Sequence, residues 1–393
     1  MVGDRPRAAP AAVLECKLSD LAHGMAGDLA VPDWPRLTPA ELAPLLAAYP
    51  GLGAVDRMVW HSQRPFAASA IVRCKGGEVF VKRQDPSFRC AADLMEEHAF
   101  VAHLRRNGIP VPAVLATAGG VTAIDGAAGV YEVHALGEGA DLYRDAHSWT
   151  PARSSAEAEA IGRALGVLHR AAQGFIAPVR RTRLLVAGDA LIRADDLQAA
   201  LLRWVADDAR LRCALASRDW RTDFQEVLSG LHRAVGPHIA AMTPLWVHGD
   251  FHASNLLWHD GQVSAVLDFG LANRASAVFD LATAIERNAI EWLRLVPGHA
   301  GIGRPDLARA LLRGYDAARP RPQQEARALR HILPLVHMDF ALSELAYFHG
   351  VTACMRNADA AYDAYLLGHA AWFAGPDGQR FLDQLSAPLE AHR

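Results

Sequence analysis

The chain has 393 residues, of which 51% are hydrophobic and 21% are charged, and its formal net charge is −3. This composition is typical of a globular protein with a sizeable core, organised as one large or two modest domains. The weak net charge gives no basic footprint for nucleic acid and no acidic field that would capture a polycation from a distance.

The cysteines and the apolar runs predict a protein of a reducing cytoplasm, without a membrane partner. No two of the five cysteines have a CxxC spacing, so they indicate neither a zinc site nor a disulfide framework. Residues 1–10 lack an apolar region and do not read as a secretory signal. No run of about 18 apolar residues occurs, so no membrane span is expected. The cysteines are Cys16, Cys74, Cys90, Cys213 and Cys354.

The first part of the chain combines a weakly patterned segment with short elements. Residues 1–36 are rich in Ala, Pro and Gly, and we expect them to form a loosely ordered lead. Thr38-Pro39-Ala40-Glu41 is a capping-box sequence with proline at the first helical position, so a short helix should begin there. Gly76-Gly77 lies between two β-rich runs and predicts a two-residue hairpin. The strands expected here are 55–60, 70–75 and 78–82.

One long helix follows these strands. Its spacing predicts a helix from Ala91 to Arg106 that ends at Asn107-Gly108. Two more strand candidates and a flexible glycine joint come next, at 111–117, 130–135 and Gly137 to Gly139.

Beyond the joint the pattern becomes helical, with one embedded hairpin. Leu256 to Trp258 and Val263 to Leu267 are apolar runs around Asp260-Gly261, the best short-range hairpin signal in the chain. The coarse architecture is therefore a small sheet-rich lobe with one helix and a larger helical lobe. Helices are expected at 156–172, 191–216 and 224–240, and over most of the remainder to about residue 385.

The segment that carries chemistry is His248-Gly249-Asp250, with Asn255 five residues after the aspartate and Asp268-Phe269-Gly270 downstream. An aspartate, an asparagine and a second aspartate in this order are typical of phosphoryl transfer. A hairpin between Asn255 and Asp268 would bring their oxygen atoms together, as a magnesium site requires. Asp250 is the candidate base that aligns the attacking hydroxyl and accepts its proton. His248 is expected to shape the loop.

A different metal site is the main chemical alternative. His248, Asp250 and His252 would share one face if this segment were a strand, and they could then ligate a metal. That interpretation leaves Asn255 and Asp268 unexplained. We therefore expect His252 to be a loop or substrate-side residue.

The sheet lobe offers the two residues that hold nucleotide phosphates in such enzymes. Lys82 ends a predicted strand, where a phosphate-binding lysine is needed. Glu97 falls within the apolar stripe of the predicted helix, where an unpaired carboxylate is costly, whereas Glu96 can reach water. We therefore predict Glu97 as the partner of Lys82. The alternatives are a solvated strand-end lysine and an exposed glutamate.

With these motifs the chain resembles the aminoglycoside phosphotransferase and choline kinase-like superfamily over about residues 50 to 370. The resemblance implies an α+β, protein-kinase-like bilobal fold with a small antiparallel β-sheet N-lobe (37–135, nucleotide-binding) and a larger, mostly α-helical C-lobe (136–393, with the catalytic loop and the acceptor site). The motifs that carry it are His248 to Asn255, Asp268 to Gly270, Phe279 to Ala282, Gly108 to Pro112 and Leu168-His169.

The resemblance also implies cofactors and roles. It implies transfer of a phosphoryl group from ATP, or from GTP, with Mg²⁺ as the cofactor metal. Asp250 would be the base, Asn255 and Asp268 the magnesium ligands, and Lys82 with Glu97 the phosphate-holding pair. Backbone groups near Ala135 to Gly137 would hold the purine, and Asp280 would bond the catalytic loop.

One departure from kinases is the missing glycine-rich loop. Protein kinases carry a GxGxxG sequence before the lysine strand, but residues 61–69 contain no glycine. Phosphate contacts are therefore expected from Ser62, Ser69 or backbone N–H groups.

The acceptor is less well indicated. Glu286, Arg287 and Asn288 are candidate lining groups, although the same residues would also suit a solvated helix start. The weak net charge argues against a strongly acidic pocket for an aminoglycoside, so a small hydroxylated metabolite is the first expectation. Residues 132–134, 142–144 and 148–151 also resemble bacterial homoserine kinase-like and stress-kinase-like members. The alternative is a stress-response-type protein Ser/Thr kinase, or a regulatory protein with a kinase fold. Further candidates on the acceptor side are Asp339 and Glu344.

Overall fold

The computed structural model describes residues 21–22, 25–26, 32–295 and 301–386. Most of the predicted lead therefore lies outside the described residues, apart from the two-residue strands β1 (Leu21–Ala22) and β2 (Met25–Ala26). The end of the lead is packed against the helical lobe, because Trp34 Nε1 donates to the Tyr347 hydroxyl at 3.1 Å and that hydroxyl donates to Asp33 at 2.9 Å. The last residues of the predicted lead thus have defined contacts with the helical lobe.

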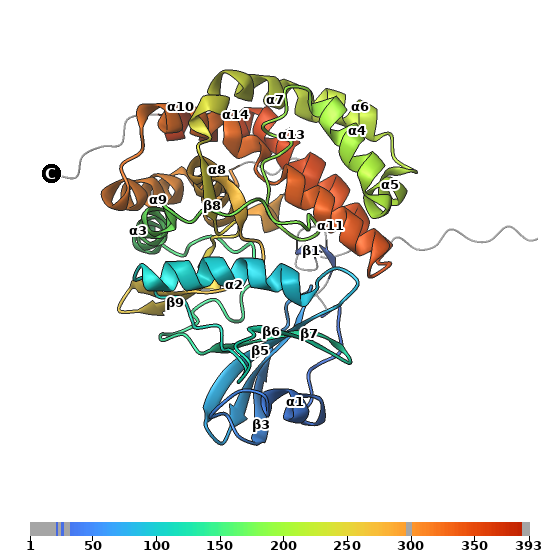
Figure 1. The fold of residues 1–393 in the computed structure, drawn as a ribbon. Coiled ribbons are helices and arrows are strands. Elements are labelled where there is room, and N and C mark those ends of the chain that lie inside the picture. Colours follow the sequence, from blue (N-terminus) through green and yellow to red (C-terminus); the bar gives the residue numbers. More distant parts are fainter. Residues whose placement is uncertain (1–20, 23–24, 27–31, 296–300, 387–393) are drawn as a thin grey trace, which may run out of the picture.

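The smaller lobe is built on a five-stranded antiparallel sheet with the order β3-β4-β5-β7-β6 (Figure 1). Helix α1 (Pro39–Leu46) begins where the sequence predicts, since the Thr38 hydroxyl accepts a hydrogen bond from the Glu41 N–H at 3.2 Å. The strands are β3 (Val55–His61), β4 (Ala68–Cys74), β5 (Gly77–Gln84), β6 (Ala123–Gly126) and β7 (Gly129–Ala135).

Two predictions for this lobe need correction. The hairpin turn consists of Lys75 and Gly76 instead of Gly76-Gly77, because Cys74 pairs with Gly77. The predicted strand at 111–117 forms only an isolated bridge, from Val114 to His134. Prolines at positions 110 and 112 remove two N–H donors that a ladder would need, and β6, which the sequence did not indicate, forms the edge of the sheet instead.

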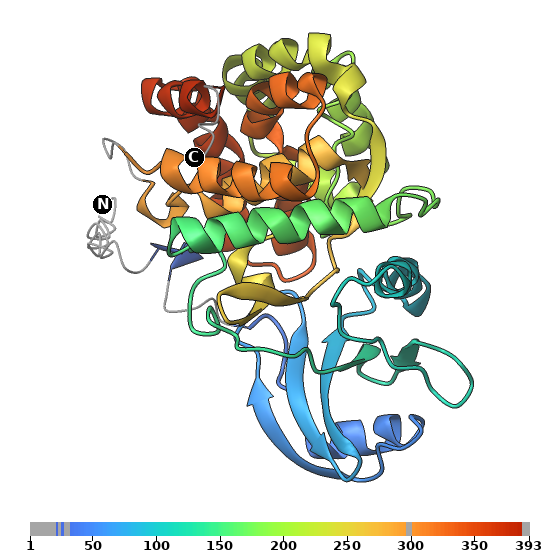
Figure 2. The ribbon, with the colours of Figure 1, turned by 90° about the vertical axis from the view of Figure 1, so that its left-hand side faces the viewer.

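Helix α2 (Ala91–Arg106) has the predicted bounds and links the sheet to the helical lobe (Figure 2). It ends at Asn107, and Gly108 takes the left-handed conformation (φ +80°) that glycine allows. The glutamates divide as predicted, since Glu97 is only 3% exposed whereas Glu96 is partly accessible.

The larger lobe is mostly helical, as predicted, but two of its predicted helices are interrupted. Asp208 separates the first into α4 and α5, because its carboxylate caps α5 by accepting from two backbone N–H groups. The second contains a π turn at Phe224–Leu228 and a 3₁₀ turn at Gly236–Ala241 on either side of α7.

The helices of this lobe, in chain order, are α3 (Ser155–Ala172), α4 (Leu197–Asp207), α5 (Ala209–Leu215), α6 (Trp220–Asp223), α7 (Ser229–Val235), α8 (Ala277–Asn288), α9 (Pro305–Ala318), α10 (Gln323–Ile332), α11 (Met338–Gly350), α12 (Met355–Asp359), α13 (His369–Ala374) and α14 (Pro376–Ser386). A nine-residue π segment, Ala360–Gly368, joins α12 to α13, and short 3₁₀ turns lie at Ala253–Asn255, Trp292–Arg294 and Leu333–Leu335.

Two small antiparallel pairs complete the helical lobe. The predicted hairpin is present as β9 (Leu256–His259) and β10 (Gln262–Val266), and it lies at the boundary between the lobes, next to α3 (Figures 1 and 2). Strand β8 (Pro244–Val247) pairs with β11 (Asn273–Ser276), a strand that the sequence did not indicate. The segment from His248 to Gly270 lies on and between these two pairs.

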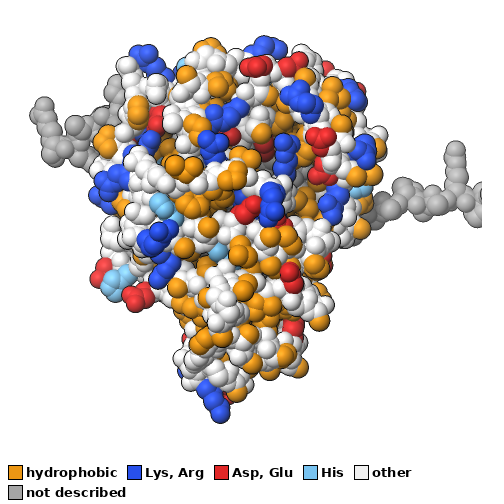
Figure 3. All heavy atoms as spheres, in the orientation of Figure 1, with side chains coloured by type: hydrophobic (Ala, Val, Ile, Leu, Met, Phe, Trp, Pro, Cys, Tyr) orange, Lys and Arg blue, Asp and Glu red, His pale blue; other side chains and the backbone are white. Residues whose placement is uncertain are grey.

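The surface charges, the cysteines and the length of the helices bear on the remaining predictions. Acidic and basic side chains are interspersed over the helical lobe on the face that Figure 3 shows. The cysteines in the described part of the chain, Cys74, Cys90, Cys213 and Cys354, are free. Among the described helices, none has both the length and the hydrophobicity needed to cross a bilayer.

Candidate active site

The β9–β10 hairpin brings the two halves of the motif together. Its turn is Asp260-Gly261, with φ values of +48° and +72°, between the paired residues His259 and Gln262. At the open end of the hairpin, the Leu267 N–H donates to the Asn255 carbonyl at 2.8 Å. Asn255 and Asp268 therefore flank the same end of the hairpin, as the sequence predicts.

Asp250 lies beside this end of the hairpin, among groups that favour its ionised form. The Asn255 amide donates to Asp250 Oδ2 at 3.2 Å, His252 Nε2 lies 3.3 Å from the same oxygen, and Arg287 Nε lies 3.5 Å from Oδ1. Burial raises the pKa of Asp250, but His252 and Arg287 outweigh burial and hold that pKa well below its usual value. Asp250 is thus a carboxylate at neutral pH.

His248 shapes the catalytic loop and does not form a metal site with its neighbours. Its Nε2 is bonded to the Leu267 carbonyl at 2.8 Å, and its Nδ1 accepts from the Asp250 N–H at 3.2 Å. Both ring nitrogens are therefore used within the loop. The alternative of His248, Asp250 and His252 as a ligand set is wrong, because the three side chains do not converge.

Two residues of helix α8 form hydrogen bonds with the backbone of the loop that follows β8. The Asp280 carboxylate accepts from the backbone N–H groups of His248 (3.0 Å) and Gly249 (2.8 Å), so the predicted contact is present. His169 Nε2 lies 3.0 Å from the same carboxylate. At the other end of α8, the Asn288 side chain accepts from the Ala253 N–H and donates to the Phe251 carbonyl, both at 2.9 Å. Asn288 is therefore a loop-holding residue.

The glycine of the motif is required by the backbone. Gly249 has φ +79°, and a Cβ there would lie 2.5 Å from Ala187 Cβ and 2.9 Å from the Leu271 carbonyl oxygen. We expect Gly249→Ala to lower the urea midpoint of unfolding and to reduce activity, because the new methyl group clashes in a disfavoured conformation. Gly230→Ala is the control, since nothing lies within 4 Å of a Cβ at that helical position. Equal midpoints for both variants would contradict this account.

The side chain of Lys82, on β5, contacts Asp268, the second aspartate of the motif. Its Nζ lies 2.9 Å from Asp268 Oδ1. Burial lowers the pKa of Lys82, but Asp268, with smaller contributions from two further carboxylates, more than offsets burial and raises that pKa. Asp268 has φ +52°, which is uncommon for a residue other than glycine and typical of functional sites.

The predicted ion pair between Lys82 and Glu97 is absent, and this prediction is corrected. Glu97 Oε2 instead lies 2.9 Å from Arg180 Nη1, and Arg180 also donates to the carbonyls of Gly270 and Asp93. Arg180 follows α3 in a segment without regular structure, 83 positions from Glu97. No local pattern could have indicated this partner.

Where kinases carry a glycine-rich loop, this chain places an arginine, which the sequence reasoning missed. Arg64 lies between β3 and β4, and its guanidinium donates to Ser148 and, at 3.0 Å, to the Ala146 carbonyl of the other lobe. Burial lowers the pKa of Arg64, and the carboxylates of Asp141, Asp250 and Asp268 oppose this effect. Ser69, predicted as a phosphate contact, is the strand partner of Lys82 in β4 and is almost buried.

The glycine joint passes closely over the hairpin. A Cβ at Gly137 would lie 2.8 Å from Leu257 and 3.1 Å from Ala265 Cβ. The Ala135 N–H, which was expected to be near the purine, already donates to the Ala113 carbonyl at 2.8 Å. The backbone groups at Leu136 and Gly137 are therefore the better candidates in this joint.

The acceptor-side candidates on α8 are buried, so a solvated helix start is the wrong interpretation of them. Arg287 lies over the Trp149 ring at 3.4 Å from its centroid and donates to the Tyr365 hydroxyl at 3.1 Å. Glu286 Oε1 lies 2.8 Å from His369 Nδ1. Glu344, on α11, lines a small pocket of about 10 Å³ with Trp149 and Tyr365.

Burial governs the protonation of the acidic groups on this side. It raises the pKa of Glu286 to about 7 and the pKa of Glu344 to about 8, although Arg287 opposes the change in both cases. Asp339, also a candidate, lies away from Asp250 and accepts from the Leu191 N–H at 3.3 Å. Asp339 is thus a support for the loop before α4.

The site fits a nucleotide with a divalent cation. The carboxylate of Asp268 and the amide of Asn255 supply oxygen atoms, which Mg²⁺ prefers, and both lie at the open end of one hairpin. The ammonium group of Lys82 is the matching charge for phosphate from the other lobe. No described residue set other than His98, Glu132 and His134 brings three histidine or acidic ligand atoms within 4.8 Å of one another.

The fold and this site define a bilobal, kinase-like phosphotransferase, and the comparisons give the family. Residues 66–330 match the model of the phosphotransferase enzyme family (APH), so the chain belongs to that family. A homoserine kinase of Phenylobacterium zucineum (strain HLK1) is 26% identical over 200 residues, which are 49% of this chain and 52% of the relative. The chain thus spans about half the length of the curated relatives it matches.

Solved structures share the fold. The amicoumacin kinase hAmiN, in complex with AMP-PNP, Ca²⁺ and Ami, has a TM-score of 0.54 and 14% identity, covering 91% of this chain and 96% of that chain. The microcompartment-associated aminopropanol kinase has a TM-score of 0.51 and 16% identity, covering 88% of this chain and 98% of that chain. Identities this low support the fold and not the substrate.

Proposed function

We propose that this chain is an ATP- and Mg²⁺-dependent kinase that transfers the γ-phosphoryl group to a hydroxyl of a small metabolite. The observation that carries the proposal is the convergence of an ionised Asp250, the hairpin-linked pair Asn255 and Asp268, and Lys82 from the opposite lobe. Membership of the phosphotransferase enzyme family supports it. GTP is the alternative donor.

The roles follow from the chemistry of the side chains. Asp250 aligns the acceptor hydroxyl and takes its proton, as the hydroxyl oxygen bonds to the γ-phosphorus and the bond to the ADP oxygen breaks. Asn255 and Asp268 would hold Mg²⁺, which supplies charge neutralisation between the phosphates. Lys82 and Arg64 would hold phosphate oxygens, and Lys82 must then leave Asp268. The purine would lie against Leu136 and Gly137.

The acceptor side favours a compact molecule that carries charges of both signs. Arg287 and Glu344 lie near Asp250, and the pKa values of Asp250 and Glu344 reflect this proximity. A guanidinium suits a carboxylate, a glutamate suits an ammonium group, and the Trp149 ring adds an apolar wall. The pocket is small, so side chains must move to admit the acceptor. We therefore propose a hydroxy amino acid first and an amino alcohol second, in line with the homoserine kinases among the relatives.

The test is a transfer assay with γ-labelled ATP and MgCl₂ against a panel of acceptors. The panel contains homoserine, serine, aminopropanol, a hexose, an aminoglycoside and a protein mixture. We expect the purified chain to label homoserine or another hydroxy amino acid most efficiently, with the Asp250→Asn variant as the blank for contaminating kinases. Labelling of the protein mixture alone would support a stress-response-type protein kinase instead. No ATP-dependent labelling of any acceptor would contradict the proposal.

A further inference from the structure

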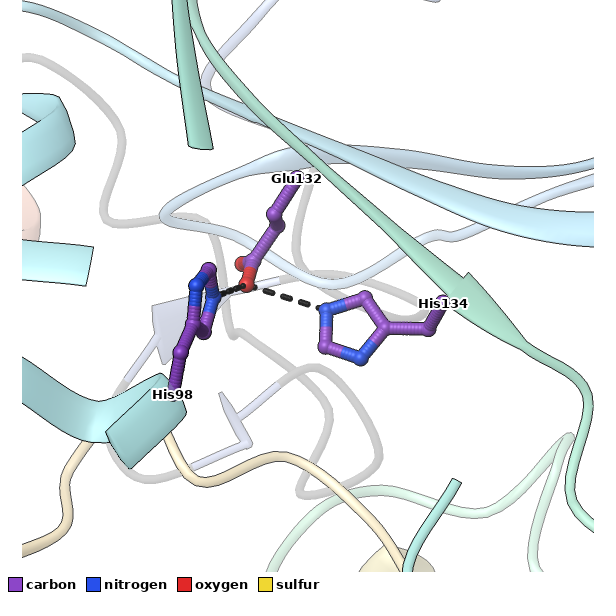
Figure 4. Close-up of side chains that lie close together, drawn as sticks. All are labelled: His98, Glu132 and His134. Carbon is purple, nitrogen blue, oxygen red and sulfur yellow. Dashed lines mark hydrogen bonds and ion pairs between the residues drawn. The ribbon is translucent and has the colours of Figure 1, made fainter. Parts of the chain in front are cut away.

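A buried cluster of two histidines and a glutamate lies outside the proposed catalytic residues. His98 comes from α2, and Glu132 and His134 come from β7 (Figure 4). Glu132 and His134 are two positions apart on the strand, so their side chains lie on the same face of the sheet. Glu132 Oε2 lies 2.8 Å from His98 Nε2 and 3.0 Å from His134 Nε2. Glu132 is 1% exposed and His98 is 5% exposed. The cluster therefore ties the helix of the small lobe to its sheet.

The three ligand atoms have the spacing of a metal site. All three lie within 4.8 Å of one another. Metal–ligand distances of about 2.0–2.2 Å in a tetrahedral site separate the ligand atoms by roughly 3.4 Å. The two contacts of Glu132, at 2.8 Å and 3.0 Å, would have to open by about half an ångström. Two imidazoles and one carboxylate are also a ligand set that Zn²⁺ accepts with a water molecule in the fourth position.

Neighbouring groups hold these ligands as outer partners do in metal sites. His98 Nδ1 lies 2.9 Å from the Thr122 hydroxyl, which leaves Nε2 directed at the cluster. Gln84 Nε2 lies 3.4 Å from Glu132 Oε1, which leaves Oε2 directed at the two histidines. Outer hydrogen bonds of this kind fix the tautomer and orientation of ligating residues.

The cluster also has a route to solvent. His98 and Thr122 line an open pocket of about 240 Å³, together with Val114, which bridges to His134. Of the three cluster residues, only His98 lines this pocket. His134 itself is 21% exposed at its side chain. The rest of the pocket lining comes from Val101, Ala102, Arg105, Arg106 and Ala113.

Charges near the cluster limit the affinity without excluding an ion. Lys82 is the strand partner of Glu132, but its ammonium group is compensated by Asp268 at 2.9 Å. Arg105 and Arg106 donate to backbone carbonyls, those of Val111 and Ala102. Both histidines must be neutral to bind a metal, so binding releases any proton that they carry.

We propose that His98, Glu132 and His134 bind one divalent transition-metal ion, of which Zn²⁺ fits the ligand set best, and that this ion fastens α2 to β7. The site is distinct from the proposed Mg²⁺ site at Asn255 and Asp268, and it does not depend on which acceptor the chain phosphorylates.

The test uses the full chain after treatment with a chelator. CoCl₂ is titrated in excess MgCl₂, so that the catalytic oxygen ligands are saturated, and binding is followed by visible absorption and by melting temperature with ZnCl₂. We expect one ion per chain, an absorption typical of a four-coordinate nitrogen-containing site, and a higher melting temperature. Asn255→Ala should retain all three signals, because Asn255 contacts Asp250 and not Lys82 or the cluster, and this separates the site from the proposed Mg²⁺ site.

The variants are His98→Gln and His134→Gln, with His103→Gln as the matched control. His103 lies on the same helix, but its Nε2 is bonded to the Ala171 carbonyl outside the cluster. Both cluster variants should lose the absorption and the metal-dependent melting shift, and the control should keep them. If a histidine variant fails to fold, the near-isosteric Glu132→Gln takes its place. The proposal is overturned if the wild-type chain takes up neither Co²⁺ nor Zn²⁺, or if the cluster variants bind as tightly as the control. The cluster would then be a hydrogen-bonded network around an ionised Glu132.

Discussion

Asp250→Asn is expected to reduce turnover by about 10²–10⁴-fold while leaving the affinity for nucleotide almost unchanged. The asparagine keeps the size of the side chain and its place beside Asn255, but it cannot accept the proton of the acceptor hydroxyl. Because His252 and Arg287 hold the pKa of Asp250 well below its usual value, the main role of the carboxylate is to orient the hydroxyl and to take its proton late in the transfer.

The measurement pairs steady-state kinetics with nucleotide binding by calorimetry. Asp260→Asn is the matched control, because it makes the same chemical change in the hairpin turn, at a side chain that is 91% exposed. Asparagine also tolerates the positive φ of that position. The control should keep wild-type turnover. A fully active Asp250→Asn variant would remove Asp250 from the role of base and leave the proposed mechanism without one.

The parts of the site that depend on local sequence could be predicted. The Asp260-Gly261 turn determines the hairpin, and the hairpin brings Asn255 and Asp268 to the same end of the two strands. The bounds of α2 follow from its apolar spacing and its terminal Gly108. Burial of Glu97 follows from the same spacing, since an inward position on a helix is a property of the helix itself.

The partners of those residues could not be predicted, because they arise from contacts between distant segments. Glu97 was assigned the right environment and the wrong partner, since Arg180 reaches it from a loop with no periodic pattern. Arg64 carries no sequence signal, because phosphate-binding loops are typically recognised by their glycines, whereas a long cationic side chain can reach the other lobe from the same loop. The cluster around Glu132 joins histidines from two separate elements, so no spacing within one segment indicated it.

Lys82→Met is expected to reduce turnover by about 10²–10³-fold and to raise the KM for ATP. The removal of one group that stabilises charge in a transition state typically reduces turnover by about this factor. Methionine keeps most of the length and apolar surface of lysine but carries no charge for the phosphates. Folding should be nearly unaffected, because the partner of Lys82, Asp268, has a side chain that is 49% exposed and can be solvated. Lys75→Met, in the exposed turn of the same sheet, is the matched control and should remain fully active.

Glu97→Gln distinguishes between Arg180 and Lys82 as the partner of Glu97. Because Glu97 is paired with Arg180, the substitution removes the nearer of the two carboxylates beside a buried guanidinium, and Glu96 remains 3.8 Å from Arg180 Nε. Loss of all partners of a buried ion typically costs about 3–5 kcal/mol, which is the upper limit here. We therefore expect a large fall in the urea midpoint for Glu97→Gln and a small one for Lys82→Met. Turnover with ATP should fall more in Lys82→Met than in Glu97→Gln. If Glu97→Gln matched Lys82→Met in its kinetics and kept wild-type stability, Glu97 would be the partner of Lys82 in the nucleotide complex. The contact with Arg180 would then be confined to the nucleotide-free chain.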